Sequence, residues 1–132
     1  MIPIAFRLLP EQDLKSSLLL ACQEREIDAA CVLTCVGSLR RAVLRFAGQA
    51  ETTIVDADFE IVSLVGTISR HGAHLHVSLS DRNGHMIGGH LFDGSLIRTT
   101  AEVVLGIIPD LLFTRQQDPQ TGYRELHIQP KD

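Results

Sequence analysis

The amino-acid sequence predicts an α+β fold: a single domain over residues 1–132, with a mostly antiparallel β-sheet and one main amphipathic helix. Residues 29–36 and 99–108 are almost continuously apolar, which is typical of strands buried on both faces. Residues 73–80 alternate between apolar and polar side chains, the period of a half-buried strand. Apolar residues recur at helical spacing in one segment only, Glu11 to about Glu26. The sequence therefore lacks the alternating strands and helices that are typical of a parallel sheet.

The N-terminal half combines the helix with the first strands. Pro10 to Asp13 is a helix start, because proline is favoured in a first turn and acidic residues suit the positive end of the helix dipole. Leu14, Leu18 and Cys22 follow at helical spacing and form the apolar face. Gly37-Ser38 is expected to break the chain between two strands. The expected strands are Ile2–Leu9, Ala29–Val36, Leu39–Ala47 and Phe59–Ser69.

The C-terminal half is predicted to contain strands only. Residues 118–122 form a turn, and the strand after it alternates like a half-exposed edge strand. One helix cannot cover a sheet of this size, so we expect association of subunits to cover the rest. The expected strands are Ala73–Ser80, His85–Phe92, Thr99–Ile108, Leu111–Gln116 and Tyr123–Gln129.

Residues 73–92 are predicted to form a β-hairpin, and its register decides which side chains meet. A two-residue loop at Asn83-Gly84 would pair Arg82 with His85. A three-residue loop, with its glycine in a left-handed bulge, pairs Asp81 with His85 instead. We predict the three-residue loop, because it sets apolar residues opposite apolar residues and a one-residue slip would scramble both faces. Its pairs are Leu79 with Ile87, Val77 with Gly89, Leu75 with Leu91 and His76 with His90.

This register brings His74, His76 and His90 together on one face of the hairpin. Residues two apart on a strand lie roughly 6–7 Å from each other, and directly opposite residues lie about 5 Å apart. Three imidazoles at this spacing suit zinc or another divalent transition metal. The alternative is a solvated polar face that carries histidines by chance. The remaining histidines are expected to be exposed: His71, His85 and His127.

Three further residues bear on what such a site would do. Gly88 and Gly89, next to the third histidine, are expected to leave space above the sheet for a bound small molecule. Glu102 interrupts an apolar run, where an isolated carboxylate is costly to bury. If the protein is an enzyme, Glu102 is the candidate general base or a hydrogen-bond acceptor for a metal-bound histidine; otherwise it pairs with an arginine.

Arg40, Arg41 and Arg45 form the one basic cluster of the sequence. They are candidates for contact with a phosphate or a nucleic acid; the alternative is a solvated edge, neutralised by nearby acidic residues. The net charge of −4 and the absence of tryptophan argue against a generic basic nucleic-acid-binding domain. The nearby acidic residues are Glu51, Asp56, Asp58 and Glu60.

Cysteine usage and the lengths of the apolar runs predict a cytoplasmic protein that does not enter a membrane. Cys31 and Cys35 would lie about 13 Å apart along a strand, too far for a disulfide, and Cys22 leaves their number odd. Reduced cysteines are typical of the cytoplasm. No export signal is visible at the N-terminus, and no apolar run approaches the length of a membrane span.

Several blocks of the sequence together resemble the plants-and-prokaryotes-conserved (PPC) domain, in its stand-alone prokaryotic form, from about Ile4 to Ile128. The combination of blocks is specific, whereas no single block is. The blocks are Val32-Leu33-Thr34, Gly37-Ser38-Leu39-Arg40, Phe59–Gly66, His74–Asp81, Gly84, Gly88-Gly89-His90-Leu91 and Thr100-Ala101-Glu102-Val103.

The resemblance implies a compact α+β domain that assembles as a homotrimer and binds a metal through His74, His76 and His90. It also implies a DNA-binding or transcription-associated regulatory role, with DNA or a DNA-binding protein as partner. The Arg-Gly-Arg-Pro core of the AT-hook, which binds the minor groove in plant members, is not found in this sequence. The alternative function is a metal-dependent enzyme or small-molecule-binding protein that uses the open coordination position of the histidine site.

Overall fold

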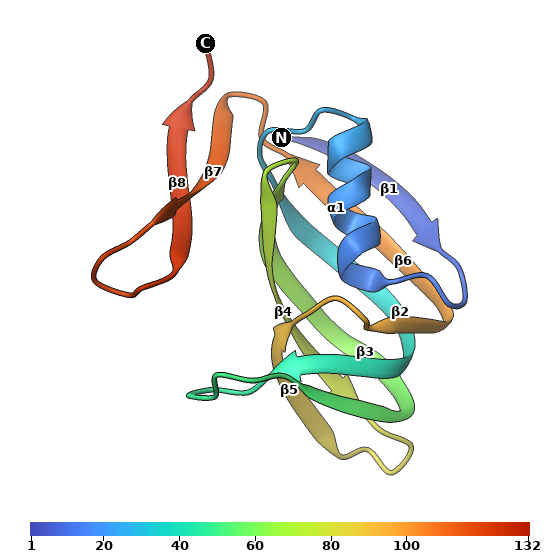
Figure 1. Ribbon diagram of the computed structural model, residues 1–132. Coiled ribbons are helices and arrows are strands. Elements are labelled where there is room, and N and C mark those ends of the chain that lie inside the picture. Colours follow the sequence, from blue (N-terminus) through green and yellow to red (C-terminus); the bar gives the residue numbers. More distant parts are fainter.

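The computed structural model describes residues 1–132 and confirms the predicted α+β class (Figure 1). A six-stranded antiparallel sheet has the order β1-β6-β2-β3-β4-β5, and a separate two-stranded sheet pairs β7 with β8. One helix, α1 (Leu14–Glu24), lies across one face of the larger sheet. The strands are β1 (Ile2–Leu8), β2 (Ala30–Arg45), β3 (Thr53–Ser69), β4 (Gly72–Ser80), β5 (Met86–Leu91), β6 (Leu96–Ile107), β7 (Leu111–Gln117) and β8 (Arg124–Pro130).

The larger sheet curls so that β2 also pairs with the edge strand β5. Over most of its length β2 lies between β6 and β3, but at its end Leu44 pairs with Leu91 and Arg45 pairs with His90. Directly opposite residues of an antiparallel pair project from the same face. The closure of β2 onto β5 therefore places Arg45 beside His90.

The predicted break at Gly37-Ser38 is wrong, because β2 continues through it as one strand. Gly37 pairs with β3 on one side and with β6 on the other. A Cβ atom at this position would overlap the carbonyl oxygen of Thr100, so glycine here allows two strands to approach closely and does not make a turn. Strand β3 likewise begins at Thr53 instead of Phe59, since it follows β2 to its end.

Helix α1 is shorter than the predicted segment from Glu11 to Glu26. Its N-cap is Asp13, whose carboxylate accepts a hydrogen bond of 3.0 Å from the Ser16 amide. Glu11 has a φ of +73°, which a right-handed helix does not accommodate, so the helix begins after it. The predicted apolar face is confirmed as buried: Leu14, Leu18 and Cys22.

The core lies between α1 and the sheet face that the helix covers. The opposite face, called here the open face, exposes more than half of the side chains of Val36, Val62 and Val65. Burial of residues 29–36 on both faces is therefore not found in the single chain. The largest fully buried side chains are those of Leu14, Leu18, Leu39, Leu44, Ile68, Leu75, Leu79, Leu91, Ile97, Leu105, Val103 and Cys22.

All cysteines are free thiols, as predicted. Burial raises the pKa of both Cys22 and Cys35 to about 11, so these thiols are protonated and unreactive at neutral pH. Helix α1 is not long and apolar enough to cross a membrane.

Strands β7 and β8 form a hairpin that extends from the edge of the molecule (Figure 1). At its base the Phe113 amide donates a 2.8 Å hydrogen bond to the Asp28 carbonyl, and Ser69 Oγ donates one of 2.9 Å to the Phe113 carbonyl. The Asp28 carboxylate is only 8% exposed and lies 2.7 Å from both Arg70 Nε and Lys131 Nζ. Lys131 follows β8, so this carboxylate attaches the end of the hairpin to the larger sheet.

Replacing Asp28 with asparagine is expected to destabilise the chain by about 1 kcal/mol at neutral pH, since water screens part of the lost attraction to the half-exposed Arg70 and Lys131. The hydrogen bond from Lys131 and the charge of Arg70 lower the pKa of Asp28 against the effect of burial. The contribution of ionised Asp28 to stability is fully present above the unfolded-state pKa of about 3.9. It is lost as the pH falls through the lower pKa that Asp28 has in the folded state.

Urea unfolding at about pH 7 and at about pH 3 tests this expectation. The difference between the wild type and Asp28→Asn should shrink at the lower pH. Asp93→Asn, which changes an exposed carboxylate, is the control and should leave stability unchanged at both. If Asp28→Asn loses the same amount of stability at both pH values, the ionised carboxylate of Asp28 is not what stabilises the wild type.

Candidate metal centre

Strands β4 and β5 form the predicted hairpin in the predicted register. The three-residue loop is confirmed, because the Asp81 amide donates a 2.9 Å hydrogen bond to the His85 carbonyl and Gly84 has a φ of +80°. One predicted pair is not formed. Leu91 pairs with Leu44 and not with Leu75, because at this position β5 is hydrogen-bonded to β2 and no longer to β4. The confirmed pairs are His76 with His90, Val77 with Gly89 and Leu79 with Ile87.

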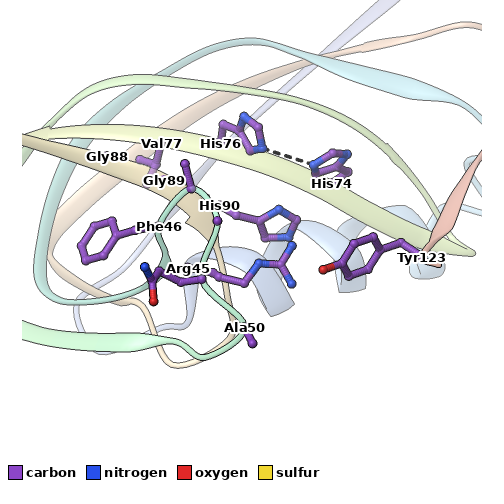
Figure 2. A pocket seen from close by; sticks show the side chains of 13 residues that line it. Arg45, Phe46, Ala50, His74, His76, Val77, Gly88, Gly89, His90 and Tyr123 are labelled. Carbon is purple, nitrogen blue, oxygen red and sulfur yellow. Dashed lines mark hydrogen bonds between the residues drawn. The ribbon is translucent and has the colours of Figure 1, made fainter. Parts of the chain in front are cut away.

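The ladder places His74, His76 and His90 together on the open face of the sheet. His76 lies opposite His90, and His74 lies two residues along β4, opposite Thr67 of β3. The ring centroids are 4.9 Å (His74–His76), 4.8 Å (His74–His90) and 5.5 Å (His76–His90) apart. One ring nitrogen of each lies within 4.8 Å of the others, and the Nε2 atoms of His74 and His76 are 3.2 Å apart (Figure 2).

This donor set fits a divalent transition metal. Zinc binds imidazole nitrogen at about 2.0–2.1 Å, so two nitrogens that share an ion lie roughly 3–3.5 Å apart in a tetrahedral site. The spacing of His74 and His76 is already in this range, and the third nitrogen lies near both. Three imidazoles leave the fourth tetrahedral position free for another ligand.

The surroundings of His74 and His90 keep these two rings in the neutral form that binds metal. Burial lowers the pKa of His90 to about 4, and the nearby charges of His74, Arg45 and Lys15 add to this effect. Burial also lowers the pKa of His74, followed by the charges of His76 and Arg115. Both rings are therefore neutral at pH 7, and a metal ion does not have to displace a proton from them.

Two cavities meet at the histidine cluster. The larger, of about 770 Å³, is lined by all three histidines, Arg45, Tyr123 and the loop of residues 46–50 (Figure 2). The smaller, of about 340 Å³, shares some of these residues and adds Arg115, Arg124 and Glu125 from the β7–β8 hairpin. The shared residues are Arg45, His74, His90 and Tyr123.

Gly88 and Gly89 line the larger cavity. A Cβ atom at Gly88 would lie 2.7 Å from the Val77 carbonyl oxygen, and one at Gly89 would lie 2.8 Å from that of Arg45. Glycine at these positions allows β5 to approach β4 and β2 closely. Both glycines thus serve close strand packing at the wall of the cavity.

The structure does not bring Glu102 to the histidines. This exposed residue of β6 lies opposite Arg7 of β1 and Val36 of β2, and it lines a different cavity, of about 330 Å³, that contains no histidine. A general base at Glu102 therefore finds no support within the chain. The apolar run misled the prediction because Glu102 projects from the open face, where a carboxylate remains solvated.

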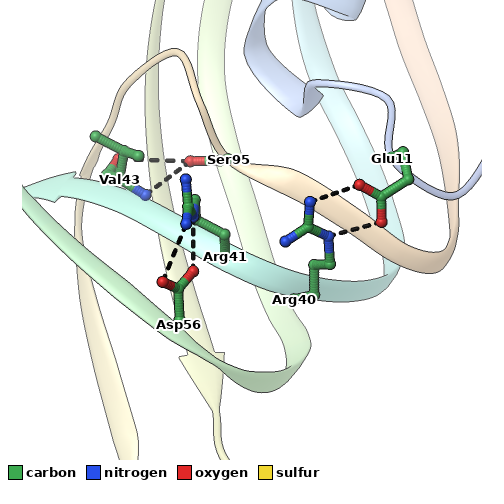
Figure 3. A network of polar contacts seen from close by, with 6 residues as sticks. All are labelled: Glu11, Arg40, Arg41, Val43, Asp56 and Ser95. Atoms are coloured by element: carbon green, nitrogen blue, oxygen red, sulfur yellow. Dashed lines mark hydrogen bonds and ion pairs between the residues drawn. The ribbon is translucent and has the colours of Figure 1, made fainter.

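The predicted arginine cluster is also divided. Arg40 donates from Nε and Nη2 to the Glu11 carboxylate at 2.6 and 2.5 Å, and Arg41 donates in the same way to Asp56 at 2.6 and 3.1 Å (Figure 3). Both pairs are solvent-exposed. Arg45 is separate from them and lies at the histidine cluster.

Four residues of the C-terminal part beside the histidines were not predicted from the sequence: Arg115, Tyr123, Arg124 and Glu125. All belong to the β7–β8 hairpin or its turn. The alternation of residues 123–129 indicated a strand, but the place where that strand lies depends on contacts of the hairpin base with Asp28 and Ser69. No local pattern in the sequence carries this information.

Fold and site together define a small α+β domain with a histidine cluster on the open face of an antiparallel sheet, a candidate metal centre. Residues 1–109 match the family model of the Plants and Prokaryotes Conserved (PCC) domain. The chain belongs to this family, whose domain is also abbreviated PPC. The matched residues end before β7, so the β7–β8 hairpin lies outside them.

Two curated relatives are the Bifunctional protein GlmU of Synechococcus sp. strain JA-2-3B'a(2-13) and that of strain JA-3-3Ab. They are 47% and 46% identical to this chain over 124 and 123 residues, which are 94% and 93% of this chain. The same alignments cover 20% of each relative, so the chain spans about a fifth of the length of the curated relatives it matches.

Solved structures share the whole fold. A hypothetical protein from Salmonella cholerae-suis has a TM-score of 0.96 and 44% identity, covering 99% of this chain and 95% of its own. A metal-containing protein from Archaeoglobus fulgidus has a TM-score of 0.77 and 28% identity, covering 96% and 94%. Structures from Bacteroides thetaiotaomicron and Ralstonia eutropha have names that refer to DNA binding, but at 19% and 17% identity they support the fold alone.

Proposed function

We propose that this protein is a metal-dependent small-molecule-binding domain in which His74, His76 and His90 hold zinc or another divalent transition metal. The observation that carries the proposal is the convergence of three imidazole nitrogens within 4.8 Å on the wall of a cavity of about 770 Å³. Cavities of about 300–1,000 Å³ are typical of small-molecule sites. The similar metal-containing protein from Archaeoglobus fulgidus supports the proposal.

Binding is favoured over catalysis by the residues that line the larger cavity. When bound, a divalent ion with three imidazole ligands supplies a Lewis acid that faces an exchangeable fourth ligand. His74 and His90 are half-buried and neutral, so they are suited to hold the ion without releasing protons. No carboxylate lines the larger cavity, and a general base of the kind expected at Glu102 is therefore missing there.

We also propose that the chain assembles as a homotrimer through the open face of the larger sheet. Val36, Val62 and Val65 are 54%, 54% and 56% exposed on this face. Full burial of an aliphatic side chain of this kind contributes about 1.5–3 kcal/mol. A closed cyclic arrangement buries such a patch on every subunit, as the resemblance to PPC domains implies.

A DNA-associated regulatory role, the other function that the sequence suggests, has less support. Arg40 and Arg41 already donate two hydrogen bonds each to a carboxylate, and a DNA phosphate would have to displace Glu11 and Asp56. Arg45 is turned to the histidine cluster. Arg40, Arg41 and Arg45 therefore do not form one unpaired basic patch, and affinity for a DNA backbone depends on such clustered cations.

Metal analysis of the purified chain tests the proposed function. We expect one zinc or similar ion per chain in the wild type and loss of stoichiometric metal in His76→Ala. Loss of an outer partner of a metal ligand costs roughly 10–100-fold in affinity, and loss of a ligand itself should cost more. The matched control is His85→Ala, which removes an exposed histidine outside the cluster and should retain the metal. Stoichiometric metal in His76→Ala would reject the site.

A further inference from the structure

We infer that the small molecule bound at this centre carries an oxyanion, a carboxylate or a phosphate group, and that Arg45 and Arg115 bind it. The inference rests on the proposed metal site and names the chemistry of its ligand. The chain as a whole has a net charge of −4. The two cavities beside the histidines nevertheless carry three arginines and one carboxylate: Arg45, Arg115, Arg124 and Glu125.

Arg45 is held in place without using its donors. Its side chain forms no ion pair and donates no hydrogen bond within the chain, whereas Arg40 and Arg41 are both paired. Its Cζ atom lies 5.4 Å from the ring centroids of both Phe92 and Tyr123, so aromatic faces orient the guanidinium. A guanidinium with free N–H groups matches a carboxylate or phosphate in a bidentate geometry.

Arg115 brings a second free cation to the same cluster from the β7–β8 hairpin. Its Nη2 donates a 3.2 Å hydrogen bond to Thr67 Oγ1, and Thr67 lies directly opposite His74 in the sheet. Glu125 lies in the same cavity, but neither it nor any other carboxylate is within ion-pair distance of Arg115. Arg45 thus flanks His90, and Arg115 flanks His74.

Two of the three arginines at the site, Arg115 and Arg124, lie outside the residues that match the family model. Arg115, Tyr123 and Arg124 all follow residue 109, where the matched region ends. Arg124 donates a 2.9 Å hydrogen bond to the Arg115 carbonyl across the two strands and is therefore a positioning residue. The geometry thus assigns metal binding to the β4–β5 hairpin, and ligand selection to Arg45 of β2 together with the β7–β8 hairpin.

The excess of positive charge in the two cavities favours a negatively charged ligand over a neutral one. The cavity linings carry three arginines against one carboxylate, Glu125, and a divalent ion would add to this excess of positive charge. Positive charges in partly buried positions are costly unless they are paired. An oxyanion at the centre compensates Arg45, Arg115 and the ion together.

Calorimetric titration of the zinc-loaded full chain tests the inference, with inorganic phosphate and succinate as probes and acetamide as the neutral control. We expect at least one anion to bind and acetamide not to bind. Arg45→Gln and Arg115→Gln should each weaken anion binding roughly tenfold or more, because each removes a charge-assisted contact. Zinc content should stay unchanged in both. Arg98→Gln, in a distant exposed ion pair with Asp58, should keep wild-type affinity.

The outcomes separate this inference from the proposed function. Binding of phosphate alone identifies a phosphate-bearing ligand, binding of succinate alone identifies a carboxylate, and either supports the inference. Failure of both anions to bind the fully zinc-loaded chain overturns it, as does equal affinity in the wild type and both variants. Absence of zinc from the wild type overturns the proposed function instead. The same titrations on the metal-free chain then decide the inference: anion binding that depends on Arg45 and Arg115 upholds it, and its absence overturns it.

Discussion

Gly37→Ala is expected to lower the free energy of unfolding by more than about 3 kcal/mol, the upper part of the range for an overpacked interior. Gly37 lies between β3 and β6 in the middle of the sheet. An added Cβ would overlap the Thr100 carbonyl oxygen and approach Ala101 Cα to 2.7 Å. These are backbone atoms of a paired strand, so no side-chain rotation relieves the contact and the strands have to separate.

Thermal or urea unfolding measures this loss, with Gly122→Ala as the control. Gly122 lies in the turn of the β7–β8 hairpin with a φ of +79°, and a Cβ there meets nothing within 4 Å. That variant reports only the cost of alanine in a left-handed conformation, roughly 1–2 kcal/mol. If both variants lose the same stability, close strand approach is not the reason for glycine at position 37.

Val62→Asp is expected to convert the proposed homotrimer into monomers. Val62 is 54% exposed on the open face, and trimer formation through that face would place its replacement in an apolar contact. An unpaired carboxylate in such a contact costs several kcal/mol on each subunit, which exceeds what the valine contributed. Light scattering coupled to size-exclusion chromatography should show the mass fall from three chains to one.

Leu20→Asp provides the matched control for this experiment. Leu20 is 51% exposed on α1, the layer on the other side of the sheet, so the same change there should leave the trimer intact. Wild-type mass in Val62→Asp would show that the open face is not the contact. A monomeric wild type would reject the trimer itself.

The β4–β5 hairpin was predictable because its information is local. Alternation along residues 73–80 and the turn chemistry of residues 81–85 both favour one register, and the structure has that register. The long strand β2 was not predictable in the same way. Gly37-Ser38 has the composition of a break, and only the backbone of β6 beside it explains why glycine stands there.

The candidate site likewise contains residues that local sequence patterns predict and residues that they do not. The histidine cluster follows from register, whereas the positions of Glu102 and Arg45 depend on how the sheet curls. An arginine on a half-exposed strand produces the same alternation in the sequence whether its side chain contacts a nucleic acid, a carboxylate or a ligand cavity. Arg40, Arg41 and Arg45 came from one cluster in the sequence and have three different surroundings in the structure.

The closure of β2 onto β5 sets an order in which the parts of the site become available during folding. The histidine hairpin needs contacts between residues close in sequence, and hairpins of this kind form within microseconds. Arg45 reaches His90 only after the chain between them has closed on itself, and long-range pairings of this kind form slowly. In the proposed site the metal-binding histidines are therefore in place in a partly folded chain, whereas the proposed oxyanion ligand would recognise only the finished sheet and stabilise it by mass action.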